Sequence, residues 1–173
     1  MPKTTLPTPH PVPAIHRRVP QHLARRFSQI CNALLSHVSE PYGLMNWHFG
    51  LLVQIRETPG MDRGSLAAAI GADATSTGQV LEMFVARGLV LRATQPGDRR
   101  AASFALTTAG EAMFQALAGP TRDVARQLLS PLSAAEADML LELLGRLVDA
   151  HEAHARPGVG RRAPKRKSAD RTA

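Results

Sequence analysis

The sequence predicts a mainly α-helical protein with one small β-hairpin. Two observations predict this fold class. Apolar residues recur at helical spacing over most of residues 15–153, and proline, glycine or capping residues separate one helical segment from the next. Between two of these segments, apolar runs flank a Pro96-Gly97-Asp98 turn, which is typical of two short antiparallel strands. We therefore expect a helical body from which a hairpin projects.

The composition places the chain among folded, basic proteins. Its 173 residues are 44% hydrophobic, which suffices for one domain of ordinary size with a buried core. The net charge of +7 is unevenly distributed, because it amounts to +4 over residues 1–43, −3 over 44–153 and +6 over 154–173. A basic tail on a mildly acidic body favours a polyanionic partner, although such a tail can also be a solubilising element.

Several classes of protein are disfavoured by what the sequence lacks. No apolar run approaches the roughly 20 residues that span a bilayer, and the amino-terminal segment lacks the apolar stretch of a secretory signal, so we expect a cytoplasmic protein with no membrane segment. Cys31 is the only cysteine, which excludes an internal disulfide and a multi-cysteine zinc site. The sequence contains no glycine-rich phosphate loop, no paired carboxylates in an apolar setting and no nucleophile beside a base. It therefore predicts no enzyme, no metal and no cofactor.

The chain divides into three parts. Residues 1–14 form a proline-rich arm with five prolines up to Pro13, and we expect this arm to be disordered. Residues 15–153 form the folded domain. Residues 154–173 are rich in Pro, Gly, Lys and Arg without apolar periodicity, which predicts a disordered basic tail.

Helices account for most of the folded domain. The first is expected from about Ile15 to just before Pro41, with Pro20 as a candidate kink, and the others at 46–56, 63–70, 74–87, about 107–129 and about 133–153. Thr107 or Thr108 caps the long helix after the hairpin, and Ser133-Ala134-Ala135-Glu136 is a capping box for the last one. The first helix has an apolar stripe that consists of Leu23, Phe27, Ile30, Leu34 and Val38.

The two short helices are separated by only three residues, Gly71-Ala72-Asp73. Gly71 allows a tight turn, and Asp73 is placed to cap the second helix. This spacing indicates a helix-turn-helix motif, and the hairpin that follows carries three basic side chains near its tip. A positively charged hairpin directly after such a motif predicts a DNA-binding wing. The predicted architecture is a winged helix-turn-helix domain with an α-helical dimerisation region.

In this order and spacing the elements resemble the MarR family of winged-helix transcription regulators, over about residues 15–153. The resemblance implies a homodimer in which the helices at about 15–39 and 107–153 intertwine, while about 46–106 bind a pseudo-palindromic site in double-stranded DNA. The apolar positions of the first and last helices support a dimer independently, because one small winged domain cannot cover them all. The most specific pieces are Leu66-Ala67, Arg87-Gly88-Leu89-Val90, Asp98-Arg99-Arg100 and Leu106-Thr107-Thr108-Ala109-Gly110.

The start and outer face of the second short helix hold the candidates for base contacts: Thr75, Ser76, Gln79 and Met83. The family often has an arginine at the position of Gln79, which suits the two acceptors of guanine, whereas glutamine suits adenine. The alternative is that Gln79 contacts only phosphate or solvent. Gly78 is unusual in the middle of a helix and would permit a close approach of the backbone to DNA.

The wing and the first short helix add further candidates. The resemblance implies that Arg100 enters the minor groove, with Asp98 orienting it through a charge-assisted hydrogen bond. Arg99 is expected to pair with phosphate, and the Ser65 hydroxyl is a second candidate phosphate contact. The alternative for the wing is a solvated surface turn.

Members of this family usually sense a small-molecule effector, and many of these effectors are aromatic carboxylic acids. Arg26 lies in a Leu23-Ala24-Arg25-Arg26-Phe27 segment similar to that of members that bind phenolic acids, and an arginine can hold a carboxylate through two hydrogen bonds. The alternative is that the aromatic residues are core and the charged groups face solvent. The other candidate ligand contacts are Trp47, His48 and Phe49, and, more weakly, His16 and His37.

These observations predict a homodimeric repressor that a small aromatic acid or its CoA thioester releases from a palindromic operator. Two alternatives stay open. One is a peroxide sensor based on Cys31, although Cys31 lies on or beside the apolar stripe and Tyr42 is the only tyrosine, which favours a structural cysteine. The other is a non-specific architectural nucleic-acid-binding protein that uses the basic tail.

Overall fold

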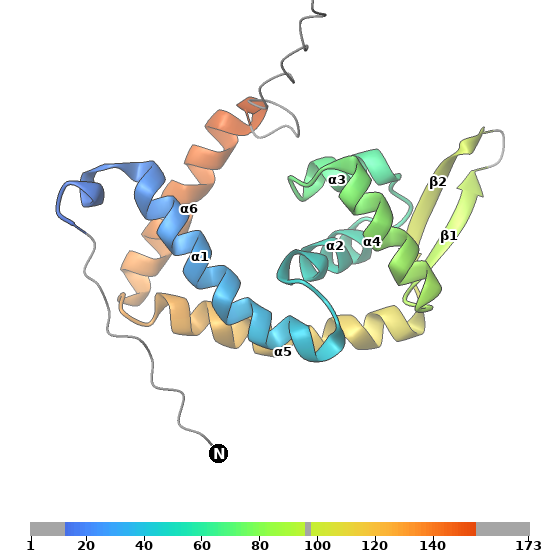
Figure 1. Ribbon diagram of the computed structural model, residues 1–173, viewed down its shortest axis with the longest axis horizontal. Helices are drawn as coiled ribbons and strands as arrows, with labels where there is room; N and C mark the ends of the chain where they lie inside the picture. Colours follow the sequence, from blue (N-terminus) through green and yellow to red (C-terminus); the bar gives the residue numbers. More distant parts are fainter. Residues whose placement is uncertain (1–12, 96–97, 155–173) are drawn as a thin grey trace, which may run out of the picture. The chain divides into compact units, whose positions relative to one another are not determined.

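The structure is a computed structural model that describes residues 13–95 and 98–154, with the backbone alone for His16, 94–95 and 98–101. The expected amino-terminal arm and basic tail thus fall almost entirely outside the described residues. The chain forms two compact units, one up to Asn46 and one from Trp47 onward. The mainly helical fold with one hairpin, predicted from the sequence, is confirmed (Figure 1).

The first unit consists of a long helix between two short 3-10 turns: η1 (His16–Arg18), α1 (Pro20–Ser39) and η2 (Glu40–Tyr42). Pro20 is the first residue of α1, and Val19 before it has an extended backbone. The predicted helix from Ile15 with a kink at Pro20 is therefore wrong at this end. The physical reason is that a proline disfavours helical geometry in the residue before it, while its missing N–H costs nothing at a helix start.

The second unit contains the remaining elements in the order that the sequence predicts. They are α2 (Asn46–Glu57), α3 (Arg63–Ala69), α4 (Ala74–Ala86), β1 (Val90–Gln95), β2 (Asp98–Leu106), α5 (Thr108–Leu129), α6 (Ala134–His151) and the 3-10 turn η3 (Glu152–His154). Its core lies among α2, α3, α4, the hairpin and α5. Phe84 of α4 is fully buried there, and the other buried apolar residues of this core include Leu51, Leu52, Ile55, Leu66, Leu81, Val90, Phe104 and Leu117.

The hairpin is longer and better anchored than the sequence indicates. Val90 pairs with Leu106 and the register continues to Thr94 and Ala102, where a bulge shifts it. On its other edge, β2 pairs with the loop before α3, because the Gly60 N–H donates to the Phe104 carbonyl at 2.9 Å and the Phe104 N–H donates to Met61 at 3.2 Å. The base of the wing is therefore hydrogen-bonded to the segment that leads into α3.

The predicted helix caps are confirmed. Asp73 accepts hydrogen bonds from the Thr75 and Ser76 amides at the start of α4, and Ser133 and Glu136 form the expected capping box of α6. Of the two candidates for α5, Thr107 is the cap, since its hydroxyl accepts from Gly110 N–H and donates to the Gly88 carbonyl. These contacts hold the start of α5 against Gly88, in the short connection between α4 and β1.

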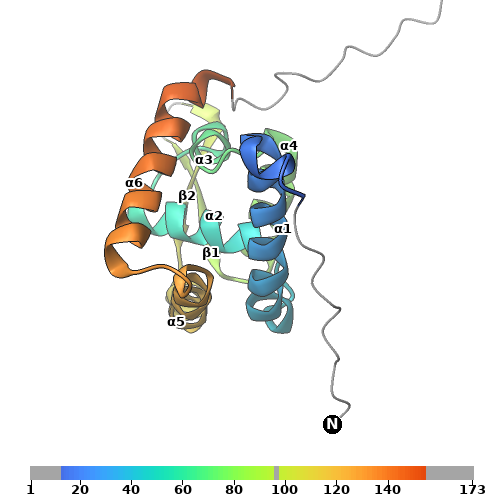
Figure 2. The ribbon, with the colours of Figure 1, turned by 90° about the vertical axis from the view of Figure 1, so that its left-hand side faces the viewer.

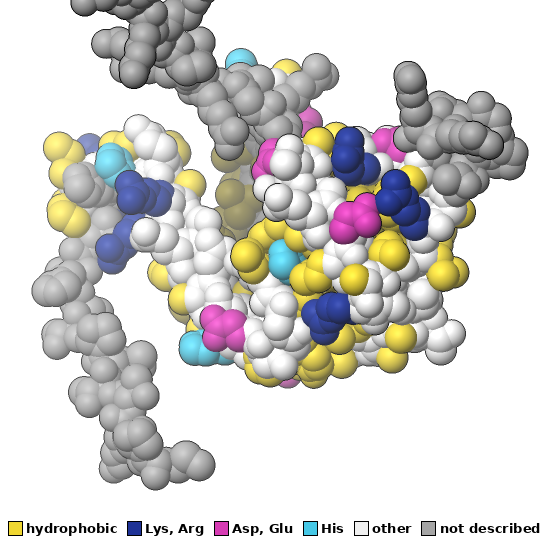
Figure 3. All heavy atoms as spheres, turned by 45° about the vertical axis from the view of Figure 1, so that its right-hand side comes forward, with side chains coloured by type: hydrophobic (Ala, Val, Ile, Leu, Met, Phe, Trp, Pro, Cys, Tyr) yellow, Lys and Arg dark blue, Asp and Glu magenta, His cyan; other side chains and the backbone are white. Residues whose placement is uncertain are grey.

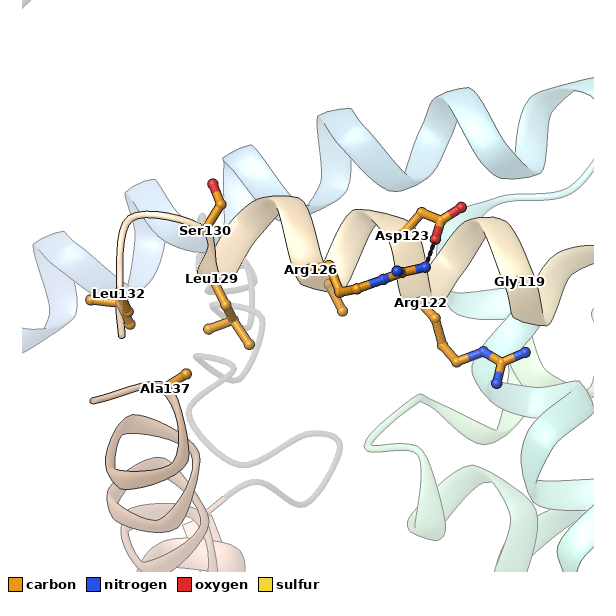
Figure 4. A pocket seen from close by; sticks show the side chains of 9 residues that line it. Gly119, Arg122, Asp123, Arg126, Leu129, Ser130, Leu132 and Ala137 are labelled. Carbon is orange, nitrogen blue, oxygen red and sulfur yellow. Dashed lines mark hydrogen bonds and ion pairs between the residues drawn. The ribbon is translucent and has the colours of Figure 1, made fainter. Parts of the chain in front are cut away.

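Within the described residues, the last helix meets the rest of its unit at the bend that follows α5. Figure 2 looks along α5 and shows α6 running across the view from the bend at residues 130–133. None of the α6 residues is buried within the described chain. At the bend, Leu129, Leu132 and Ala137 point toward one another and line a mostly apolar pocket of about 840 Å³ (Figure 4). Farther along the wall of this pocket, Arg126 forms an ion pair with Asp123.

Candidate nucleic-acid interface

Helices α3 and α4 form a helix-turn-helix with a capped start on each helix. The Asp62 carboxylate accepts hydrogen bonds from the Gly64 and Ser65 amides and from the Ser65 hydroxyl, at 2.7, 3.1 and 2.7 Å. These bonds, led by the one from the hydroxyl, hold the pKa of Asp62 below its usual value. Gly71, in the turn, has a left-handed backbone (φ 65°), as predicted for a tight turn.

Helix α4, the expected recognition helix, is anchored along one side and open along the other. Thr77, Val80, Leu81 and Phe84 are buried against the rest of the unit. Of the predicted base-reading residues, Thr75 and Gln79 are exposed and lie one turn apart, whereas Ser76 and Met83 are half-buried. The geometry therefore leaves Thr75 and Gln79 as the most accessible of the four.

A groove of about 750 Å³ lies between α4 and the hairpin. In Figure 3, basic side chains and an acidic one lie close together on the surface over this part of the protein. Across the groove, Arg92 of β1 donates to Glu82 of α4 at 2.7 Å. Three charged residues that the sequence did not indicate also line the groove: Arg63, Glu82 and Arg92. The one sequence feature that indicated this place was Gly78, a glycine in the middle of a helix.

The predicted contacts of the wing and of Ser65 stay predictions. Asp98, Arg99 and Arg100 belong to strand β2, but their side chains lie outside the described part of the structure. The Ser65 hydroxyl, a predicted phosphate contact, donates to Asp62 and thus already contributes to the cap of α3. A phosphate at Ser65 would have to compete with this carboxylate for the hydroxyl proton.

The predicted ligand contacts fall in both units of the chain. Arg26 and His37 are exposed on α1. His16 lies in η1, and its side chain is outside the description. The other three candidates belong to α2 and the second unit: Trp47, His48 and Phe49.

His48 is part of the core around α4. Its ring meets the Trp47 ring edge to face at 4.5 Å between centroids and the Phe84 ring at 6.1 Å. Burial lowers the pKa of His48, and the positive charge of Arg87 lowers it further. Both effects favour the neutral form of the imidazole.

Phe49 joins α2 to α5. It stacks on Phe114 with 5.7 Å between ring centroids, and the Arg56 guanidinium lies over the same Phe114 ring at 4.5 Å. Arg56 also forms an ion pair with Glu111 of α5 at 3.0 Å. This cluster ties the helix before the helix-turn-helix to the long helix after the wing.

Three other sequence expectations can be compared with the described residues. Cys31 is half-buried on α1. Within residues 13–95 and 98–154, no group of three or more His, Cys, Asp or Glu side chains is placed to hold a metal ion. No helix of this described part is both long and apolar enough to cross a membrane.

Several solved structures share this arrangement of elements. A probable transcriptional regulator from Pseudomonas aeruginosa is 31% identical with a TM-score of 0.69, over 76% of this chain and 98% of that one. The PcaV transcriptional regulator from Streptomyces coelicolor is 28% identical with a TM-score of 0.64, over 78% and 98%, and its structure in complex with its natural ligand is also known. A mutant MarR from E. coli, complexed with operator DNA, has the same fold at 24% identity and a TM-score of 0.69, over 79% and 99%.

No family model matches the sequence. The assignment therefore depends on the relatives of known structure and on the winged helix-turn-helix geometry. The match to the regulator from Pseudomonas aeruginosa includes nearly the whole of that protein, and the PcaV match is as complete. The chain belongs to the MarR family of winged-helix transcription regulators.

Proposed function

We propose that the chain acts as a homodimeric repressor that binds a pseudo-palindromic operator in double-stranded DNA and is released from it by a small aromatic acid or its coenzyme A thioester. The observation that carries the DNA-binding part is the geometry of α4. This helix is capped at its start, anchored by a buried side and open at Thr75 and Gln79 beside the hairpin. An exposed helix of this kind fits the major groove, which displays a distinct pattern of donors and acceptors for each base pair.

The proposed dimer is supported by the uncovered apolar residues of α6 and α1. On α6, Met139, Leu143, Leu144, Leu147 and Val148 recur at helical spacing and are all exposed in the single chain. On α1, Leu23, Phe27 and Ile30 are exposed in the same way. Apolar stripes of this length are normally covered in a folded protein. A second copy of the chain supplies matching stripes and would place two recognition helices about one DNA turn apart, roughly 34–36 Å.

The proposed effector site is centred on Arg26. The side chain is exposed on α1 directly beside Phe27, one turn before Ile30. If a partner subunit covers the apolar stripe, this guanidinium lies at the edge of a desolvated surface, where a carboxylate binds more strongly than in water. PcaV, one of the relatives, has been determined with its natural ligand, which supports effector binding in this fold.

The first prediction tests base reading by Gln79. Gln79→Ala is expected to relax the preference at one base pair per half-site by about 1 to 3 kcal/mol, because a glutamine amide donates to and accepts from adenine at the same time. The measurement is a base-by-base scan of one half-site in a duplex that the wild-type protein selects from a random library. Gln127→Ala, which removes an exposed glutamine from α5, is the matched control. An unchanged preference in the Gln79 variant would show that this side chain reads no base.

The second prediction tests the effector site. A panel of aromatic carboxylic acids and their coenzyme A thioesters is screened for stabilisation of the folded protein by thermal shift. Arg26→Ala is expected to keep its affinity for the selected duplex but to lose both the thermal shift and the release from DNA. By linkage, an acid that weakens DNA binding must itself bind the DNA complex less tightly by the same factor.

The neighbouring Arg25→Ala is the control for Arg26, because it removes an equally exposed charge from the same turn of α1. It should respond to the acid as the wild type does. A variant lacking Arg26 that still leaves DNA at the wild-type concentration of acid would rule out the carboxylate site.

A further inference from the structure

Gly78 lies in the middle of α4, and its missing side chain makes room for Arg63. A Cβ at Gly78 would be 3.2 Å from Cδ and 3.4 Å from Nη1 of Arg63. The first of these distances is closer than side chains normally approach one another. Glycine is unfavourable in a helix interior. Gly78 therefore lowers the stability of α4 at the point where the Arg63 side chain crosses it.

The Arg63 side chain lies in the groove between α4 and the hairpin. Thr75 and Gln79, the exposed residues of the recognition helix, line the same groove, as does Arg92 of β1. Arg63 therefore reaches the side of α4 that faces the wing, although it belongs to α3. The side chain is exposed, which leaves its guanidinium accessible from solvent.

The described carboxylates near Arg63 are engaged with other groups. Glu82, the acidic residue of α4 in the groove, is paired with Arg92 at 2.7 Å. Asp62, next to Arg63 in sequence, accepts three hydrogen bonds within the cap of α3. Among the described residues, none forms an ion pair or hydrogen bond with Arg63. The Arg63 guanidinium thus carries a positive charge that no described carboxylate neutralises.

We propose that Arg63 binds a phosphate of the DNA backbone and that Gly78, by lacking a side chain, leaves the space that positions the Arg63 side chain. This inference rests on the proposed function. If α4 enters a major groove and the hairpin approaches the adjacent minor groove, one sugar–phosphate strand must pass between them, over the groove that holds Arg63. A guanidinium matches the geometry of a phosphate, to which it donates two parallel hydrogen bonds.

A phosphate contact makes a specific prediction for Arg63→Ala. Affinity is measured by fluorescence anisotropy at several salt concentrations, for the duplex selected by the wild type and for a shuffled duplex of the same composition. Both affinities are expected to fall by about 100-fold, because the dimer loses two contacts and the loss of each charge-assisted hydrogen bond weakens binding by about tenfold. The slope of log affinity against log salt is expected to decrease in magnitude by about 2, because each of the two subunits no longer neutralises one phosphate.

The control is Arg122→Ala, which removes the same charge from α5, outside the groove. It should leave both the affinity and the salt slope at their wild-type values. If Arg63→Ala also leaves them unchanged, Arg63 does not contact DNA. If the variant loses affinity for one base pair only, it reads a base, and the phosphate assignment is overturned.

The positioning role of Gly78 is tested by a double-mutant cycle. Gly78→Ala is expected to keep or raise the melting temperature, because alanine is the better helix former, and yet to weaken binding to both duplexes by displacing Arg63. In a protein that already carries Arg63→Ala, the additional Gly78→Ala change should have no further effect, since the residue that it displaces is absent. Additive losses would mean that the new methyl group meets DNA directly, which would overturn the positioning role. A wild-type protein that selects no duplex at all would overturn the proposed function, and the role of Arg63 with it.

Discussion

Leu147→Glu is expected to convert the proposed dimer into a monomer and to weaken operator binding by about 100-fold or more, because two linked half-sites no longer bind together. Leu147 is 58% exposed in the single chain, so the substitution removes little from the core of one subunit. In the proposed dimer the same position is covered by the partner, and an unpaired carboxylate there would cost several kcal/mol. Sedimentation equilibrium measures the association, and fluorescence anisotropy measures the binding to DNA.

The control for Leu147→Glu introduces the same carboxylate on the polar side of α6. Gly145 is exposed and lies two residues before Leu147, on the opposite side of the helix, and nothing lies within 4 Å of a Cβ at this position. Gly145→Glu should therefore remain dimeric and should bind the selected duplex. A Leu147→Glu protein that sediments as a dimer with wild-type affinity would show that α6 does not form the subunit interface.

Gly110→Ala is expected to destabilise the protein by about 3 kcal/mol, at the upper end of the usual cost of overpacking. Gly110 is buried in the first turn of α5, where a Cβ would lie 2.0 Å from the Leu89 carbonyl oxygen. That oxygen belongs to the backbone and accepts a hydrogen bond from the Thr107 N–H at 3.0 Å, so it cannot move aside without breaking the start of α5. Urea unfolding at a fixed protein concentration measures the loss.

Gly50→Ala is the control for Gly110, because it makes the same chemical change in the middle of α2. Nothing lies within 4 Å of a Cβ at Gly50, and the position is exposed. This variant should gain about 0.5 to 1 kcal/mol, since alanine loses less backbone freedom on folding. If the two variants had equal stability, the close approach of Gly110 to Leu89 would not be a constraint on the fold.

The parts of the fold that depend on neighbouring residues were predictable from the sequence. Asp73, Thr107 and Ser133 each cap the helix that they precede, because a short polar side chain at that position bonds the first free amides. The error at Pro20 was local too. Apolar spacing extends past this proline, and it outweighed the backbone restriction that makes Pro20 the first residue of α1.

Features that depend on residues far apart in the sequence could not be predicted in the same way. The hydrogen bonds of Gly60 and Met61 with Phe104 have no local signature, because the residues of each segment do not indicate which other segment it pairs with. In the candidate site, the chemistry of Gln79 and its place on a helix predict a base contact from the sequence alone. The role of Arg63 has no such local signal, because it depends on how α3 crosses α4 at Gly78.

The cluster of Phe49, Arg56, Glu111 and Phe114 has a mechanical consequence. It joins α2 to the first turns of α5 through a ring stack, a cation–π contact and an ion pair, so we expect these turns to tilt together with the helix-turn-helix. Helix α5 has 22 residues, and a helix of that length spans about 33 Å, so a tilt of about 5° at one end shifts the other by about 3 Å. In the proposed dimer, α5 therefore acts as a lever between the subunit interface and the DNA-binding elements. A small rotation where α6 meets its partner would displace the recognition helix by a distance comparable to the length of a hydrogen bond.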